Sequence, residues 1–268
     1  MTYARMIMAS LAGVVLLAAT AAPAAIINYG DFGPVPSGVL FLNVAESSGS
    51  DAVPLYGPPT VFATGLDFNP TNFVATTSGG GADLTEGQLN FTITGASIQS
   101  ISLFEAGDYT LGGVGTTATQ VFAGAIMRAT ITAIDGLNVA PISLIPVNGS
   151  VGFNLLSNPG IVQPWSLGLG LNVEGQLTAL NIPFEFGATR VDVVIDNNLT
   201  AISEASSVAF IAKKDFRFDA VPGVIVPEPG MAGLLGLGLC GLAKRRRRRN
   251  QKTGGRGGAS PAYRRSRS

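Results

Sequence analysis

The sequence predicts an all-β protein: a single antiparallel β-sandwich of the jelly-roll type, flanked by an N-terminal signal peptide and a short C-terminal apolar helix. Of its 268 residues 35 are glycine, and only 13% are charged, which is typical of a loop-rich β protein. Apolar and polar residues alternate in many short segments, and no long segment between the two ends has helical periodicity. Spacing of this kind favours about nine short strands in one sandwich. We find no repeat of fixed length, which disfavours a β-solenoid or a propeller.

The first clear strand is "QLNFTIT", residues 88–94, in which Leu89, Phe91 and Ile93 share one face. The segment "SIQSISLFE", residues 97–105, follows after a three-residue connection. We therefore predict that it forms the second arm of a β-hairpin.

Further strands are expected along the rest of the body. The segment 123–135 alternates between two faces, one of which carries the apolar residues Met127, Ala129, Ile131 and Ala133. The segments 169–180 and 189–198 continue the strand pattern, and 206–220 is predicted to form a final pair of short strands. Two turns are expected from their residue types, at Gly79-Gly80-Gly81 and at Asn197-Asn198.

The N-terminus has the pattern of a secretory signal peptide. A single cation, Arg5, precedes an apolar run from Met6 to Ala19, and Ala22-Pro23-Ala24 fits a cleavage site for signal peptidase. We expect the signal peptide to span 1–24 and the sandwich to span 25–222. The remaining segments are expected to be a linker (223–230), an apolar membrane segment (231–243) and a basic cytoplasmic tail (244–268).

The C-terminal apolar run, Met231–Ala243, is short for a membrane span. As a helix its 13 residues would extend about 20 Å, against a bilayer core of about 30 Å. The basic block that follows would stay on the cytoplasmic side and stop translocation. The block consists of Lys244, Arg245, Arg246, Arg247, Arg248 and Arg249. A weak anchor beside a strong stop suits a segment that is held in the membrane only transiently.

Immediately before this run lies a Pro-Glu-Pro motif, formed by Val226, Pro227, Glu228 and Pro229. In this order, signal peptide, body, motif, apolar run and arginine block, the chain resembles the PEP-CTERM sorting proteins of Gram-negative bacteria. The C-terminal segment of that family is also labelled "ice-binding protein C-terminal domain". The resemblance covers about 25 residues. It implies an exosortase as partner, cleavage near the motif, and delivery to the cell surface or extracellular matrix.

Charge and composition exclude several function classes. Between residues 26 and 226 there are five Lys and Arg against 16 Asp and Glu, a net charge of −11. Such a body repels nucleic acid, so we expect no nucleic-acid partner. The chain has no histidine and a single cysteine, Cys240, which excludes catalytic triads that need histidine and metal sites built from His and Cys.

Carboxylates are the remaining candidates for chemistry. Glu86, Glu105, Glu174 and Glu185 could supply a glycosidase-like pair, but their spacing singles out no two of them, and we expect solvated side chains on strand faces and no enzyme. No cofactor is expected, apart from a calcium ion that oxygen ligands beside turns could hold. Those candidate ligands are Asp67, Asn69, Asp192, Asp196, Asn197 and Asn198.

Three functions therefore stay open. The first is an exported, non-catalytic protein of the cell surface or extracellular matrix. The second is a carbohydrate-binding module, calcium-dependent or not, with an extracellular polysaccharide as partner. Its aromatic candidates are Trp165, Tyr29, Tyr56 and Tyr109. The third is a glycosidase-like enzyme.

Overall fold

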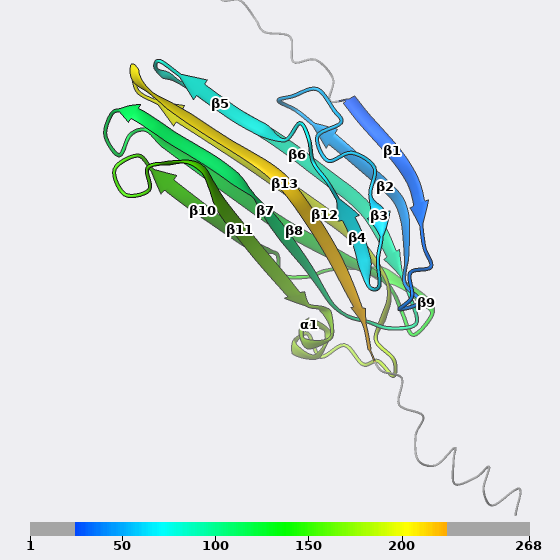
Figure 1. Ribbon diagram of the computed structural model, residues 1–268. Coiled ribbons are helices and arrows are strands. Elements are labelled where there is room, and N and C mark those ends of the chain that lie inside the picture. Colours follow the sequence, from blue (N-terminus) through cyan, green and yellow to red (C-terminus); the bar gives the residue numbers. More distant parts are fainter. Residues whose placement is uncertain (1–24, 224–268) are drawn as a thin grey trace, which may run out of the picture. The chain divides into compact units, whose positions relative to one another are not determined.

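A computed structural model describes residues 25–223, and these form two antiparallel β-sheets packed face to face, as predicted. The seven-stranded sheet has the order β1-β2-β6-β12-β8-β10, with β9 also paired to β8. The six-stranded sheet has the order β11-β7-β13-β4-β3, with β5 also paired to β13. Figure 1 shows the six-stranded sheet in front of the seven-stranded one.

The strands differ widely in length, and the longest have 17 residues. The seven-stranded sheet contains β1 (Ala25–Phe32), β2 (Leu40–Ser48), β6 (Gly81–Thr94), β8 (Gln120–Ile134), β9 (Leu137–Ser143), β10 (Val147–Asn154) and β12 (Ala188–Ser203). The six-stranded sheet contains β3 (Thr60–Val61), β4 (Gly65–Phe68), β5 (Val74–Ser78), β7 (Ile98–Val114), β11 (Gly160–Asn172) and β13 (Ser206–Pro222).

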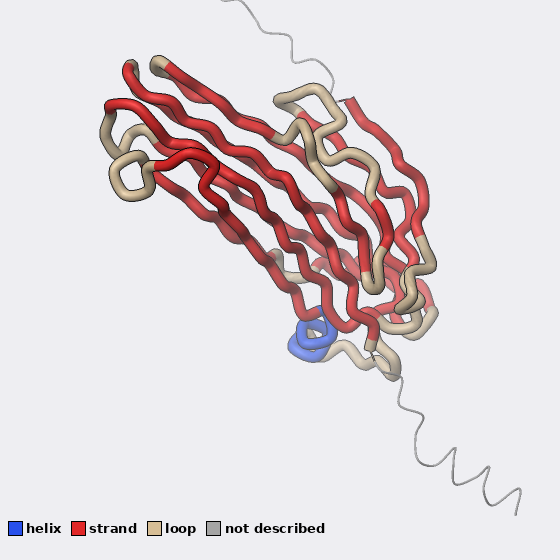
Figure 2. The backbone as a smooth tube through the Cα atoms, viewed as in Figure 1, coloured by secondary structure: helices blue, strands red, loops and turns tan. Residues whose placement is uncertain are grey.

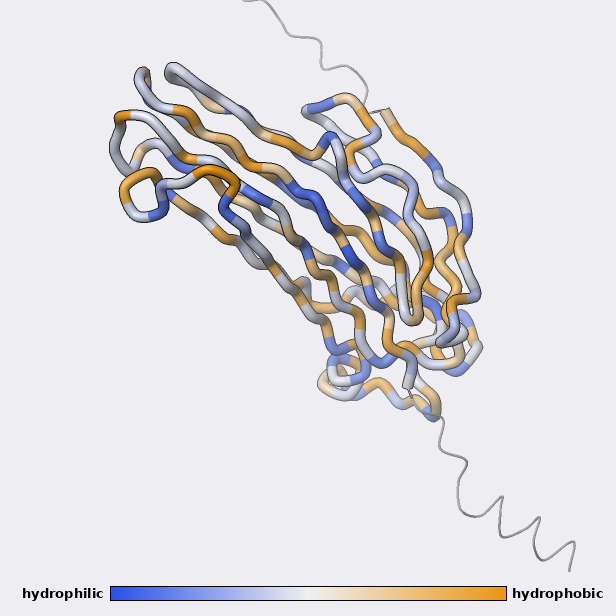
Figure 3. Tube along the Cα trace, in the orientation of Figure 1, coloured by the Kyte–Doolittle hydropathy of each residue, from blue (hydrophilic) through white to orange (hydrophobic). Residues whose placement is uncertain are grey.

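Alternating side chains build the core between the sheets. Leu89, Phe91 and Ile93 of β6 are buried, as their spacing predicts, and so is the apolar face of β8 from Met127 to Ala133. Figure 3 shows this alternation of hydrophobic and hydrophilic residues along the strands. Aromatic rings with edge-to-face contacts fill much of the core: Phe41, Phe91 and Phe218 in one group, and Tyr56, Phe68, Phe73 and Phe216 in another.

The predicted hairpin of 88–94 with 97–105 is wrong. β6 pairs with β2 and β12, whereas β7 pairs with β11 and β13 in the other sheet. Consecutive strands from β6 to β8 thus alternate between sheets, as in a jelly roll. Alternation indicates that one face of each strand is buried, but it does not indicate which strand lies beside it.

Two further expectations from sequence are corrected. Asn197-Asn198 is not a turn, because both residues lie within β12 and pair with strands on either side. The segment 169–180 is not one strand: β11 ends at Asn172, and the helix α1 (Val173–Ala179) follows. The Asn172 side chain caps this helix by accepting a hydrogen bond from the Gly175 N–H, and Val173 and Leu177, four residues apart, are buried.

The expected pair of short strands at 206–220 is a single strand, β13, with a register shift between Lys213 and Asp215 where it pairs with β7. This bulge changes the parity of the buried positions from Ala209 and Ile211 before it to Phe216 and Phe218 after it. The sequence pattern breaks at the bulge, which accounts for the apparent interruption.

Figure 2 shows α1 at one end of the strands, with the connecting loops gathered at the two ends of the sandwich. Within residues 25–223 no helix has the length and apolar character needed to cross a bilayer. The expected signal peptide (1–24) and C-terminal segments from 224 onward lie outside the described residues.

Candidate functional site

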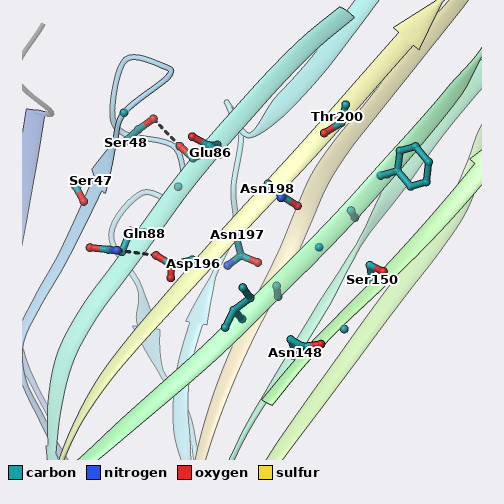
Figure 4. Close-up of a pocket in the computed structure, with 18 residues that line it drawn as sticks. Ser47, Ser48, Glu86, Gln88, Asn148, Ser150, Asp196, Asn197, Asn198 and Thr200 are labelled. Carbon is teal, nitrogen blue, oxygen red and sulfur yellow. Dashed lines mark hydrogen bonds between the residues drawn. The ribbon is translucent and has the colours of Figure 1, made fainter. Parts of the chain in front are cut away.

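The outer face of the seven-stranded sheet carries an open groove with a volume of about 690 Å³. Its lining comes from β2, β6, β12, β8 and β10, so it crosses the sheet rather than following one strand. Figure 4 shows polar side chains on all of these strands except β8. The groove is therefore assembled by the sheet from segments far apart in the sequence.

Strand register sets these side chains in transverse rows. One row runs from Ser47 through Gln88, Asp196 and Ile126 to Asn148.

The next row runs from Glu86 through Asn198 and Gly124 to Ser150. Neighbouring strands lie about 4.8 Å apart, so each row offers polar side chains at that spacing except on β8, where Ile126 and Gly124 interrupt it.

Two glycines let side chains of the groove lie over a neighbouring strand. A Cβ on Gly124 would lie 2.6 Å from Asn198 Oδ1, so the Asn198 amide lies over the bare backbone of β8. A Cβ on Gly152 would lie 2.6 Å from two ring carbons of Phe122, so that ring lies over β10. Phe122 is an aromatic side chain in the groove lining, and 39% of its surface is exposed.

A chain of hydrogen bonds fixes one wall. Asn90 donates to Gln88 Oε1 (2.9 Å), and Gln88 Nε2 donates to Asp196 Oδ1 (2.6 Å). The second carboxylate oxygen of Asp196 is paired with the Arg128 guanidinium. Both oxygens of Asp196 are thus engaged, and the side chain is held in place before any ligand arrives.

Other polar groups in the groove are available to a ligand. The side chains of Asn148, Ser150 and Asn198 are exposed, and within residues 25–223 they make no hydrogen bond. Together they offer amide donors, amide acceptors and a hydroxyl.

The four glutamates singled out from sequence do not come together. Glu86 lines the groove, Glu174 lies in the first turn of α1, and Glu185 is exposed between α1 and β12. Glu105 contradicts the expectation of a solvated side chain, because it is fully buried in the core beside Lys213. Its parity on β7 is the reason, since it follows Ile101 and Leu103 on the inward face.

Most of the aromatic candidates are also in the interior. Trp165 is buried, and its Nε1–H donates to the Ala212 carbonyl (3.0 Å). Tyr56 is buried within the aromatic core, and Tyr109 stacks on Phe153 with ring centres 4.2 Å apart. Tyr29 is half-buried on β1, outside the groove lining. None of these four side chains lines the groove.

The calcium candidates are dispersed as well. Asp67 lies on β4, Asp192 and Asp196 lie on the outer face of β12, and Asn197 is buried. Asp192 accepts a hydrogen bond from Thr92 Oγ1 (2.6 Å), so its carboxylate already has a protein partner. Among residues 25–223 no group of three or more Asp, Glu, His or Cys side chains is placed to hold a metal ion.

The predicted sorting motif, Val226, Pro227, Glu228 and Pro229, and the basic block 244–249 lie outside the described residues. Phe122, Asn148 and Ser150 were missed as site residues, and Asn198 was considered only as a calcium ligand. In "VNGSVGFN", residues 147–154, small and polar residues alternate with apolar ones, which indicated an outer polar face but not its partners on other strands.

Comparisons with known proteins add little beyond the fold. No protein-family model matches the chain, and no curated protein matches it. Among solved structures, TmCBM61 in complex with β-1,4-galactotriose is 10% identical, with 75% of this chain and 90% of that chain covered and a TM-score of 0.22. A structure of the infectious bursal disease virus Gt strain is 12% identical, with 71% and 43% covered and a TM-score of 0.24. Similarity this weak indicates neither a ligand nor an activity for this chain.

Proposed function

We propose that this chain is an exported, non-catalytic protein of the cell surface or extracellular matrix that binds a neutral polysaccharide in the groove of its seven-stranded sheet. The observation that carries the binding proposal is the groove itself. It presents the unengaged amides of Asn148 and Asn198 and the hydroxyl of Ser150 on neighbouring rows, together with the exposed ring of Phe122. Sugars are bound in this way, through hydroxyl hydrogen bonds and contact with an aromatic face.

Charge favours a neutral ligand over an acidic one. The described residues carry five Lys and Arg against 16 Asp and Glu, and the groove itself contains Glu86 and Asp196. Arg128, which lies beside the groove, is already paired with Asp196. An anionic polysaccharide would therefore meet a repulsive field, whereas a neutral chain would not.

Export and sorting rest on the sequence at the two ends. The proposed route is a signal peptide (1–24), transient anchoring through 231–243, and cleavage by an exosortase near Glu228. A protein delivered in this way would meet extracellular polysaccharide directly.

The test is a glycan array of neutral and acidic oligosaccharides, probed with the full-length protein with and without a calcium chelator. Binding is expected to neutral chains. Asn198→Ala should weaken it by about tenfold, because the loss of one to two hydrogen bonds is worth about 1.4 kcal/mol. Binding that disappears with chelator would assign a calcium ion to the site.

Phe122→Ala should weaken binding as well, and Phe104→Ala is its matched control. Phe104 is similarly exposed (44% against 39%) but lies on β7, in the opposite sheet. Equal loss in both variants, or no binding to any neutral glycan, would contradict the assignment of the groove.

A glycosidase is the alternative that one observation favours, since Glu86 and Asp196 both line the groove. Their neighbouring strands pair Glu86 with Asn198 and Gln88 with Asp196, so the two carboxylates are diagonal neighbours. We favour binding without catalysis because both oxygens of Asp196 are engaged. Release of reducing ends from a bound glycan, lost in Glu86→Gln, would establish the enzyme instead.

A further inference from the structure

The core contains three polar side chains that no binding role uses. Lys213 of β13, Glu105 of β7 and Asn197 of β12 are all buried. Lys213 Nζ lies 2.6 Å from Glu105 Oε2, but within residues 25–223 neither group makes a well-oriented hydrogen bond. Asn197 Oδ1 also lacks a hydrogen-bond partner among these residues. Buried polar atoms left in this state are uncommon and need an explanation.

The three side chains lie in one region of the core between the sheets, which we call the aromatic chamber. Its walls are the rings of Tyr56, Phe73 and Phe216. Lys213 Nζ lies 4.5 Å from the ring centre of Phe73 and 5.6 Å from that of Tyr56. From the other sheet, Asn197 Nδ2 donates to the hydroxyl of the same Tyr56 (2.8 Å). The amine and the amide therefore approach one tyrosine from opposite sheets.

Lys213 and Asn197 lie at equal distances along their strands from the connection between β12 and β13. β12 and β13 lie in opposite sheets and are consecutive, and each of the two residues is eight positions from Ala205 in the connection between them. The bulge in β13 begins only after Lys213, so the inward parity holds up to this residue. Both side chains thus point into the space between the sheets, where each lies beside Tyr56.

Stability alone gives no reason for this arrangement. Desolvating a lysine and a glutamate costs several kcal/mol per ion, and apolar residues of similar volume are often as stable or better. Here burial lowers the pKa of the Lys213 amine and raises the pKa of Glu105, each opposed by the attraction between them. Both shifts favour an uncharged amine beside a protonated carboxyl.

We propose that Lys213 and Asn197 form an intramolecular isopeptide bond between the two sheets, with Glu105 as the proton carrier. The reaction needs no co-reactant. The uncharged Lys213 amine attacks Cγ of Asn197, the protonated Glu105 carboxyl gives its proton to Nδ2, and the resulting carboxylate takes a proton from the attacking nitrogen. Ammonia leaves, and an Nζ–Cγ amide remains. The Lys213 amine and Asn197 Oδ1 have no hydrogen-bond partners within residues 25–223, so no protein hydrogen bond of either atom has to break before Nζ attacks Cγ.

Such a cross-link would hold the sandwich as a disulfide holds other exported domains, and residues 25–223 contain no cysteine. It would join the last strand of the six-stranded sheet in chain order to the central region of the other sheet. The three side chains lie in the core, so this bond would form whether or not the groove binds a polysaccharide.

The test is mass spectrometry of the folded, then denatured, full-length protein. The expected mass is lower than that of the sequence by one ammonia. A protease that cuts after glutamate separates 186–204 from the fragment beginning at 205, and these two fragments should stay joined. Full mass with separate fragments would overturn the proposal, and so would ammonia loss without joining, which marks cyclisation at an asparagine.

Single substitutions test the roles of Lys213 and Glu105 in forming the bond. Lys213→Arg should restore the full mass, while Lys214→Arg, a matched control at the exposed neighbour that pairs with Asp108, should keep the loss. Glu105→Gln preserves the shape of the side chain but cannot carry the proton, so its product should keep the full mass. An unchanged cross-link in Glu105→Gln would remove Glu105 from the chemistry. The wild-type result decides the proposal even if a variant fails to fold.

Discussion

Individual carboxylates in this protein hold irregular segments by accepting backbone hydrogen bonds. Glu46 is buried and accepts from the N–H groups of Leu55, Tyr56 and Gly57 at 2.7, 3.0 and 3.2 Å. Asp135 binds the chain just before β12 in the same way. These contacts explain why acidic residues are abundant in a body with few cations: several of them pair with backbone donors instead of with Lys or Arg.

Asp135 gives a prediction about acid. Burial raises its pKa, but hydrogen bonds from the N–H groups of Glu185, Phe186 and Gly187 outweigh this, and the pKa lies below its ordinary value of 3.8. A lowered folded-state pKa adds stability that is present above the ordinary value and is lost as the pH falls through the folded one. Asp135→Asn should therefore reduce the difference in unfolding free energy between pH 7 and pH 3, measured by urea titration.

The control for this change is Glu185→Gln, on the loop that Asp135 binds, whose side chain makes no hydrogen bond within residues 25–223. It should leave the urea midpoint at pH 7 unchanged, whereas Asp135→Asn should lower it. Identical pH dependence in wild type and Asp135→Asn would show that this carboxylate does not contribute to acid sensitivity.

Among the elements, β11, β7 and β13 are tied together by one tryptophan. Trp165 on β11 reaches across Gly107 on β7, and its indole N–H donates to the Ala212 carbonyl on β13. The crossing requires a glycine, because a Cβ at Gly107 would lie 1.9 Å from the Ala212 oxygen and 2.9 Å from Trp165 Nε1. The edge strand β11 is thereby held to the sheet by more than its backbone ladder.

Gly107→Ala should destabilise the protein by about 1–3 kcal/mol, the range for forced overpacking, and more if the indole bond is also lost. Gly170→Ala is the matched control, because a Cβ at Gly170 on β11 meets nothing within 4 Å. Thermal or urea unfolding of the two variants checks this. Equal stability would mean that the strands separate enough to admit a methyl group without cost.

At the scale of the whole molecule, charge is segregated along the chain. Eleven of the 17 Lys and Arg lie from Lys244 onward, while the body has a net charge of −11. A basic tail beside an apolar run is suited to stopping translocation. The negative charge of the body would make copies of it repel one another, which opposes self-association.

Replacing Pro227, Glu228 and Pro229 with alanines tests the sorting proposal. In the native host the variant should accumulate as a longer form in the membrane fraction, because the processing signal is lost while the apolar run and arginine block remain. Immunoblots of membrane and extracellular fractions measure this. Glu185→Ala, which changes an exposed acidic residue of the body whose side chain makes no hydrogen bond within residues 25–223, controls for general effects on export. Release of the alanine variant at the wild-type size would rule out the motif as the signal.

Period-two alternation by itself determined the all-β class and the buried faces of β6 and β8, because side chains on a strand point to opposite sides in turn. It could not determine sheet partners, so the predicted hairpin of β6 with β7 was wrong. It also missed the cap at Asn172, where a short helix follows a strand without a break in hydrophobicity. Which strands pair, and where a strand gives way to a helix, depend on contacts between segments that are distant in the sequence.

The candidate site depended on tertiary structure almost entirely. Composition excluded histidine chemistry and a disulfide within the chain, because those conclusions need only residue types, and the net charge of the body led us to expect no nucleic-acid partner. The groove needed five strands in register before Asn198, Gly124 and Ser150 formed a row. Likewise Lys213 and Asn197 are ordinary polar residues in the sequence. Only the packing of two sheets, which removes water from both side chains and turns them toward the same tyrosine, gives them a chemical relationship.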